Sequence, residues 1–171
     1  MLGDIIATSA NVALTLSVIV AVIFGIIQAK QAARDRRERL ALDTLRNFQS
    51  REFAELMHYI NSQHMPTSFA QMRARSADEQ VKYIQFSMQM EMLGLLVAEG
   101  LIGIDLVDKT LGAYVMTTWE KYKQMFEDAR VKAPDPYLGE YFQWLAEHID
   151  ERVRQSNREP FYKQVRPTEK V

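Results

Sequence analysis

The chain contains no cysteine, and this absence excludes several classes of site. Disulfide frameworks, zinc–thiolate centres, iron–sulfur clusters and cysteine nucleophiles all need that side chain. An excess of positive charge is also absent, because 21 Lys and Arg residues face 22 Asp and Glu residues. The chain therefore lacks the basic footprint of a nucleic-acid-binding protein, and we expect no nucleic-acid partner.

Catalytic and metal-binding motifs are missing as well. Only seven glycines occur, and they form no glycine-rich phosphate loop. The sequence contains no serine nucleophile elbow. The three histidines, His58, His64 and His148, show none of the spacings of a zinc or di-iron site. We expect no catalytic residue, no cofactor and no metal.

The segment MQMEM raises the question of a copper site, because thioethers are soft ligands. On a helix, however, Met88 and Met92 share one face while Met90 points nearly the opposite way. The three side chains cannot converge on one ion, so core packing by flexible methionines is the better interpretation. Glu91 lies in the same segment, and we expect it to form an ion pair, for example with Lys121, or to be exposed.

Charged residues are absent from Ile5 to Ile27. At about 1.5 Å per residue, a helix over this run crosses the ~30 Å hydrocarbon core of a membrane. A cleaved export signal begins with basic residues and has an apolar core of only about 7–15 residues, and neither condition holds here. A buried helix of a soluble protein rarely needs more than about 20 uncharged residues in a row. The run therefore predicts a permanent transmembrane anchor.

Basic residues gather directly after the apolar run, at Lys30, Arg34, Arg36, Arg37 and Arg39. The positive-inside rule places such a cluster in the cytoplasm. We therefore predict a single-pass protein of the inner (cytoplasmic) membrane, with its N-terminus outside and its C-terminal domain cytoplasmic. The same side chains are candidates for contacts with the headgroups of membrane lipids.

Small residues recur at every fourth position, a pattern that lets membrane helices approach closely. This first stripe consists of Ser9, Ala13, Ser17, Ala21, Gly25, Ala29 and Ala33. A second stripe alternates spacings of three and four and carries polar residues that favour a partner across a helix interface. The predicted helix-packing residues are Asn11, Ala13, Thr15, Ser17, Ala21 and Gly25. The expected partner is a second copy of the chain or a larger membrane protein complex.

The rest of the sequence favours helices, and the expected fold class is all-α. One long helix is predicted from about Ile5 to about Phe48. The predicted parts are a transmembrane anchor at 1–29, a basic helical stalk at 30–48, a cytoplasmic bundle of about four helices at 49–155 and a flexible tail at 156–171.

Capping residues mark the expected helix starts in the bundle. Ser50 and Ser76 are predicted N-caps, and Ser76 has capping-box spacing with Glu79. Asp105 and Asp135 are predicted to cap the last two helices. Apolar residues then follow helical spacing. They are Phe53, Leu56, Met57 and Ile60; Val81, Ile84, Met88, Met92, Leu95 and Leu96; Leu111, Val115, Thr118, Trp119 and Tyr122; and Tyr141, Trp144, Leu145 and Ile149.

Five segments in this order resemble a family of small prokaryotic single-span membrane proteins, domain of unknown function 4760. The segments are Leu93–Leu96, Gly100–Ile104, Leu111–Gly112, Trp119–Lys121 and Phe142–Glu147. The resemblance covers roughly residues 1–150 and implies fold and topology, but no reaction.

The leading functional hypothesis is a membrane-anchored interaction, accessory or scaffold protein without catalysis, which self-associates or packs on a larger complex through its span. The alternative is a membrane-tethered sensor or regulator whose stalk relays a signal to the bundle. That alternative requires a pocket among Trp119, Tyr122, Tyr141 and Trp144, although aromatic residues at helical spacing are more often core. An enzyme acting through Glu91, and a pore lined by polar residues of the span, are weaker alternatives.

Overall fold

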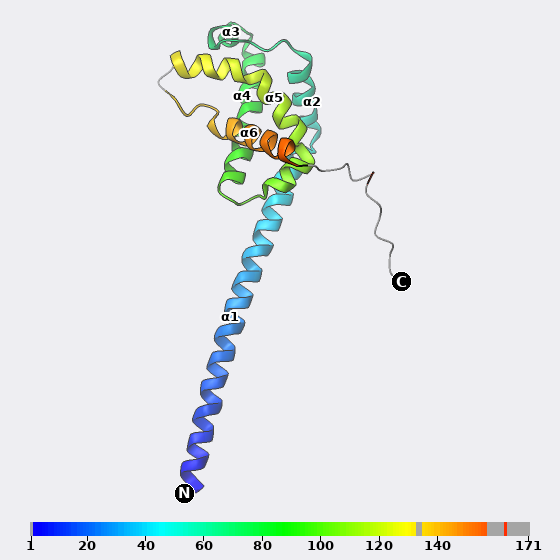
Figure 1. Ribbon diagram of the computed structural model, residues 1–171. Coiled ribbons are helices and arrows are strands. Elements are labelled where there is room, and N and C mark those ends of the chain that lie inside the picture. The colour runs from blue at the N-terminus through cyan, green and yellow to red at the C-terminus, as the bar shows by residue number, and fades with distance from the viewer. Residues whose placement is uncertain (1, 133–134, 157–162, 164–171) are drawn as a thin grey trace. The chain divides into compact units, whose positions relative to one another are not determined.

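The computed structural model describes residues 2–132, 135–156 and 163, with the side chains of residues 2–13 and 15 outside the description. The described residues form six helices and no strand, which confirms the all-α fold (Figure 1). The helices are α1 (Leu2–Phe48), α2 (Arg51–Ser62), α3 (Phe69–Arg73), α4 (Ala77–Ala98), α5 (Ile104–Lys132) and α6 (Glu140–Gln155). The chain divides into two compact units, Met1–Asp43 and Thr44–Val171. The predicted tail lies largely outside the described residues.

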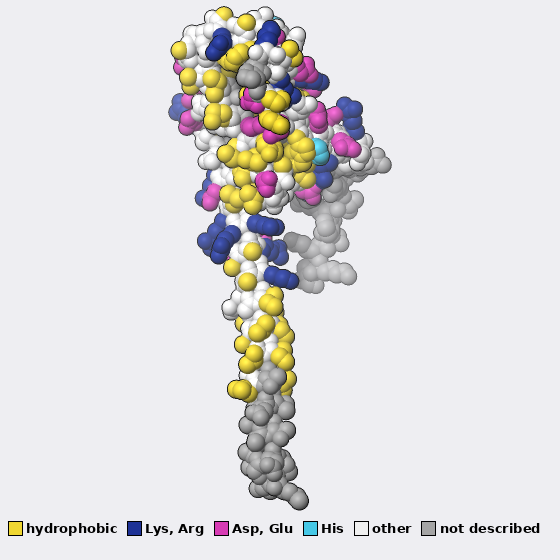
Figure 2. Space-filling model, turned by 90° about the vertical axis from the view of Figure 1, so that its left-hand side faces the viewer, with side chains coloured by type: hydrophobic (Ala, Val, Ile, Leu, Met, Phe, Trp, Pro, Cys, Tyr) yellow, Lys and Arg dark blue, Asp and Glu magenta, His cyan; other side chains and the backbone are white. Residues whose placement is uncertain are grey.

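The first unit carries a continuous apolar surface along α1. Its exposed large side chains are Leu14, Leu16, Val18, Ile19, Val20, Val22, Ile23, Phe24, Ile26 and Ile27. Figure 2 shows these hydrophobic side chains along the helix, followed by a cluster of Lys and Arg. The helix is long and apolar enough to cross a membrane.

Two predicted caps in the second unit are confirmed. The Ser50 hydroxyl accepts a hydrogen bond from the backbone N–H of Phe53 at 3.1 Å, and α2 begins one residue after the cap. Ser76 and Glu79 form a reciprocal capping box at the start of α4. These bonds satisfy backbone N–H groups that the first turn of a helix otherwise leaves without partners.

The predicted caps of the last two helices are wrong. Helix α5 already begins at Ile104, so Asp105 lies inside its first turn and pairs with Arg152 of α6. Asp135 accepts a hydrogen bond from the Tyr137 backbone N–H at 3.0 Å, which makes a local turn rather than a helix start. Helix α6 begins only after Gly139, whose φ of 73° is left-handed and suits glycine.

The core of the bundle forms where α6 packs against α4 and α5. Aromatic side chains fill it: Phe86 stacks on Tyr122 at 5.6 Å between ring centroids, and Trp119 meets Phe142 edge to face at 5.3 Å. The predicted buried stripe of α5, from Leu111 to Tyr122, is confirmed. On α6, Leu145 and Ile149 are buried as predicted, Tyr141 and Trp144 are half-buried, and the fully buried aromatic residue is Phe142.

A glycine brings α4 and α6 into backbone contact. A Cβ atom on Gly94 would lie only 2.2 Å from the carbonyl oxygen of Tyr141. No side chain fits in that space, so α6 approaches α4 to a distance that only glycine permits. Gly112 on α5 also lies close to α6, but the approach is less close, because a Cβ there would lie 3.3 Å from a methyl carbon of Ile149.

Candidate interaction surface

Helix α4 is apolar on both sides, but the bundle covers only one of them. The covered side holds Tyr83, Phe86, Met90, Leu93, Gly94 and Val97. The opposite side exposes Val81 (59%), Ile84 (45%), Met88 (65%) and Met92 (56%). Helices that are apolar all round are normally buried all round, so this open side has the composition of an interface. The helical spacing that predicts α4 is correct, but these four residues face away from the core.

An apolar groove borders this exposed side. It is lined by residues from the last turn of α1, the start of α2 and α4, and its volume is about 670 Å³. The thirteen lining residues are Thr44, Asn47, Phe48, Ser50, Glu52, Phe53, Val81, Ile84, Gln85, Met88, Gln89, Met92 and Leu93. All of them belong to the second unit. Phe48 and Phe53 meet edge to face at 4.9 Å and give the groove an aromatic wall.

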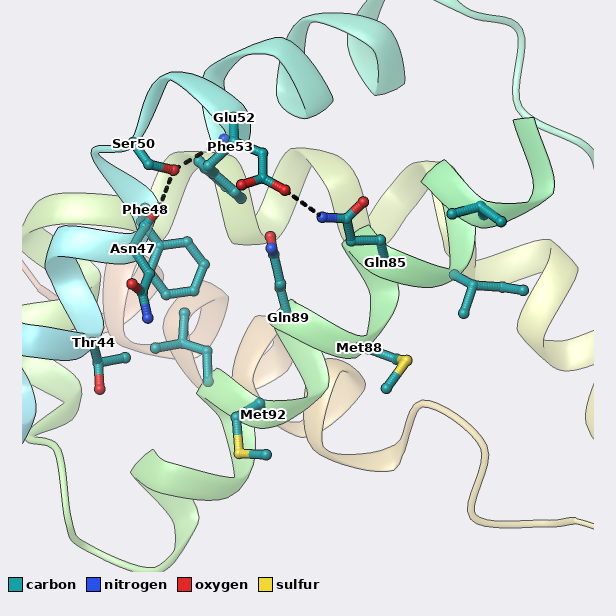
Figure 3. Close-up of a pocket in the computed structure, with 13 residues that line it drawn as sticks. Thr44, Asn47, Phe48, Ser50, Glu52, Phe53, Gln85, Met88, Gln89 and Met92 are labelled. Atoms are coloured by element: carbon teal, nitrogen blue, oxygen red, sulfur yellow. Dashed lines mark hydrogen bonds between the residues drawn. The ribbon is translucent and has the colours of Figure 1, made fainter. Parts of the chain in front are cut away.

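The groove also has a small polar wall. The Gln85 side-chain N–H donates to Glu52 at 3.2 Å, and Figure 3 shows the two residues facing each other, with Met88 and Met92 on neighbouring turns of α4. The Oε1 atom of Gln89 is buried and accepts no hydrogen bond from the described residues. A buried acceptor without a donor costs about 1–3 kcal/mol.

The predicted helix-packing residues fall on α1. The side chains of Asn11, Ala13 and Thr15 lie outside the described residues. Ser17, Ala21 and Gly25 are exposed, in line along the helix at spacings of four. A Cβ on Gly25 meets nothing within 4 Å, so the space beside it is open to a neighbouring helix.

The predicted headgroup-binding residues form the next part of α1. Lys30, Arg34, Arg36, Arg37 and Arg39 are all exposed. Arg34 pairs with Glu38 one turn later, at 2.9 Å. Exposed pairs of this kind are weak, and the local surface keeps an excess of basic side chains.

The four aromatic residues of the predicted pocket lie in different surroundings. Trp119 and Tyr122 are buried in the core, and the Tyr122 hydroxyl donates to the Tyr83 carbonyl at 3.1 Å. Burial raises the pKa of Tyr122 well above its usual 10.

The other two aromatic residues lie away from this core. Trp144 packs on His148 at 4.3 Å between ring centroids, at a separate depression. Tyr141 is half-buried and turns its backbone toward Gly94.

Glu91 and Lys121 each bind a helix end instead of each other. The Glu91 carboxylate accepts hydrogen bonds from the backbone N–H groups of Tyr141 and Phe142 at the start of α6. Lys121 donates to the Ile60 carbonyl and to the Asn61 carbonyl and side chain at the end of α2. Glu91 therefore does not pair with Lys121, the example given for its ion pair. Each charge has the sign that favours the helix end it contacts.

The described residues contain no group of three or more His, Asp or Glu side chains that could hold a metal ion. The groove residues were not predicted as a site. Their signal in the sequence is that residues 81–97 place apolar side chains on both faces of one helix, more than one core needs.

Together these features define the class: an all-helical protein with an N-terminal helix apolar enough to cross a membrane and a small bundle that leaves one apolar helix face open. A family model described as domain of unknown function (DUF4760) matches residues 15–149. The chain belongs to this family, as its sequence motifs predict. Comparisons with curated proteins and with solved structures give no match.

Proposed function

We propose that the chain is a membrane-anchored interaction or accessory protein without catalysis. The observation that carries this proposal is the open apolar side of α4, where Val81, Ile84, Met88 and Met92 are about half exposed or more. Residues of this kind on one helix face are typical of protein–protein contact sites. The bundle would then offer a binding surface, and α1 would hold it at a membrane.

The charge pattern of α1 supports the topology of the proposal. Basic side chains directly follow the exposed apolar segment. By the positive-inside rule, this order supports a topology with the N-terminus outside and the bundle on the cytoplasmic side of the inner membrane. The stripe of Ser17, Ala21 and Gly25 supports association through the span, with a second copy or a larger membrane protein.

Two observations favour this function over the alternatives. The sensor hypothesis needs a ligand pocket among four aromatic residues, two of which, Trp119 and Tyr122, are buried in the packed core. The enzyme hypothesis needs an available carboxylate at Glu91, whose oxygens both accept backbone hydrogen bonds.

The proposal is tested by the mass of the full-length chain and its crosslinked products, extracted from its membrane in mild detergent. We expect the wild-type chain to run in a complex larger than a monomer. Gly25→Ile should reduce the crosslinked species severalfold, because the added side chain prevents close helix approach. Val20→Ile, an added methylene on an exposed apolar residue of the same helix outside the small-residue stripe, is the matched control and should leave the complex intact. A monomeric wild-type chain would contradict the proposed function.

A further inference from the structure

We propose that the groove between α4 and the start of α2 binds an amphipathic helix of a partner protein, which inserts an apolar stripe and places a Lys or Arg beside Glu52. This inference rests on the proposed function and names the chemistry of the partner. It goes beyond the membrane span, because every residue of the groove belongs to the second unit.

The shape of the exposed face fits a helix. Val81, Ile84, Met88 and Met92 follow spacings of three and four, so they form a ridge along α4. From residue 81 to residue 92 this ridge is about 16 Å long at 1.5 Å per residue, which matches three turns of a partner helix. Helix-in-groove recognition uses apolar anchors at this spacing, and methionine side chains adapt to the shape of such anchors.

The charge of the groove determines which side chains the partner helix should carry beside its apolar stripe. Among the thirteen lining residues, Glu52 is the only one that carries a charge. Its described partner is the neutral amide of Gln85, while the neighbouring ion pair on α2 is formed by Arg51 with Glu55. An ammonium or guanidinium group from the occupant would make a charge-assisted hydrogen bond to Glu52.

Two other occupants fit this lining less well. A second copy of the chain in a two-fold contact would present the same patch to itself, and that patch contains no Lys or Arg to pair with Glu52. An anionic lipid would bring negative charge toward a carboxylate, which costs free energy. The acidic and otherwise apolar lining therefore favours a basic amphipathic helix of another protein.

The test uses the full chain in nanodiscs of zwitterionic phosphatidylcholine and two fluorescein-labelled stapled helical peptides. Both peptides carry the same leucine stripe, one flanked by lysines and the other by glutamates. Fluorescence anisotropy, corrected with empty nanodiscs, should show the lysine peptide binding at least tenfold more tightly. Glu52→Lys should reverse this preference, and Glu52→Gln should reduce it at least threefold.

Glu55→Lys is the matched control. It makes the same charge change one turn further along α2, outside the groove, and should keep at least half of the wild-type preference. Met88→Glu should weaken binding of the lysine peptide at least tenfold by placing a charge on the ridge. Circular dichroism melts check that each variant folds.

The inference is overturned if the two peptides bind equally, or if Glu55→Lys changes the preference as much as Glu52→Lys. Displacement of the lysine peptide by a labelled fatty acid, or peptide-free dimers that Met88→Glu abolishes, would assign the groove to a lipid or to a second copy and would also overturn it. Equal binding of the two peptides, or an equal effect of Glu55→Lys, leaves the complex mass and the Gly25→Ile result unaffected. The proposed function and this inference can therefore fail separately.

Discussion

Glu91 of α4 binds the start of α6 at Phe142, whose backbone N–H donates to the carboxylate at 2.9 Å. Tyr141 donates to the other carboxylate oxygen at 3.2 Å. The residue before α6 is Gly139, which has no side chain that could cap the helix. A carboxylate from a different helix thus supplies the acceptors and the negative charge that a helix N-terminus requires. One side chain thereby fixes α6 on α4.

Removing that carboxylate should destabilise the bundle. Glu91→Gln keeps one acceptor oxygen but loses the charge, and we expect a loss of about 1 kcal/mol in the free energy of unfolding. Glu91→Ala leaves two backbone N–H groups without partners and should lose about 2–3 kcal/mol. Urea unfolding of the full chain in detergent, followed by the fluorescence of Trp119 and Trp144, measures both. Glu127→Ala, at an exposed position of α5, is the control. An equal loss of unfolding free energy in this variant would contradict a capping role for Glu91.

The two glycines that face α6 should respond differently to alanine. At Gly94 the new Cβ would overlap the backbone of Tyr141, which cannot move without shifting α6, so we expect a loss of about 3 kcal/mol. At Gly112 the nearest atom is the Asp108 carboxylate oxygen at 3.0 Å, on a side chain that can rotate. The higher helix propensity of alanine then offsets most of the cost, and the variant should stay within about 1 kcal/mol of wild type. Similar unfolding free energies for Gly94→Ala and Gly112→Ala would contradict the close backbone contact.

The sequence predicts those parts of the fold that depend on neighbouring residues. The Ser50 cap and the Ser76–Glu79 capping box are local, because each hydrogen bond spans three residues. The buried stripe of α5 is equally clear, since the opposite side of that helix is polar. The start of α6 is not local. Its acceptor, Glu91, lies fifty residues earlier in the chain, so no nearby pattern indicates it.

The orientation of α4 was harder to predict for a different reason. Periodicity identifies a buried face only when the other face is polar. On α4 both Met88 and Met90 occupy apolar faces, and Met90 is the one in the core. Gly94 and the aromatic residues of α5 determine which face is covered, because Gly94 lets α6 pack closely against α4 and the aromatic residues pack on the same face. For the same reason the sequence did not predict the groove, because the residues of its ridge have the composition of a buried core.

The capping box of α4 should make stability depend on acid pH. Hydrogen bonds from the Ser76 hydroxyl and backbone N–H hold the pKa of Glu79 below its usual 4.5, with smaller contributions from Tyr59 and Arg75. The unfolded chain therefore binds this proton at a higher pH than the folded chain does. The stabilisation is complete above pH 4.5 and is lost as the pH falls through the lower pKa of the folded state.

Urea unfolding at pH values from 6 to 3 measures this loss. The free energy of unfolding should decline less steeply with falling pH for Glu79→Gln than for the wild-type chain, and Ser76→Ala should lie between the two. Some slope should remain, because hydrogen bonds from Lys132 and from the Phe69 backbone also lower the pKa of Asp128. A Glu79→Gln profile parallel to that of the wild-type chain would show that the capping box does not set this dependence.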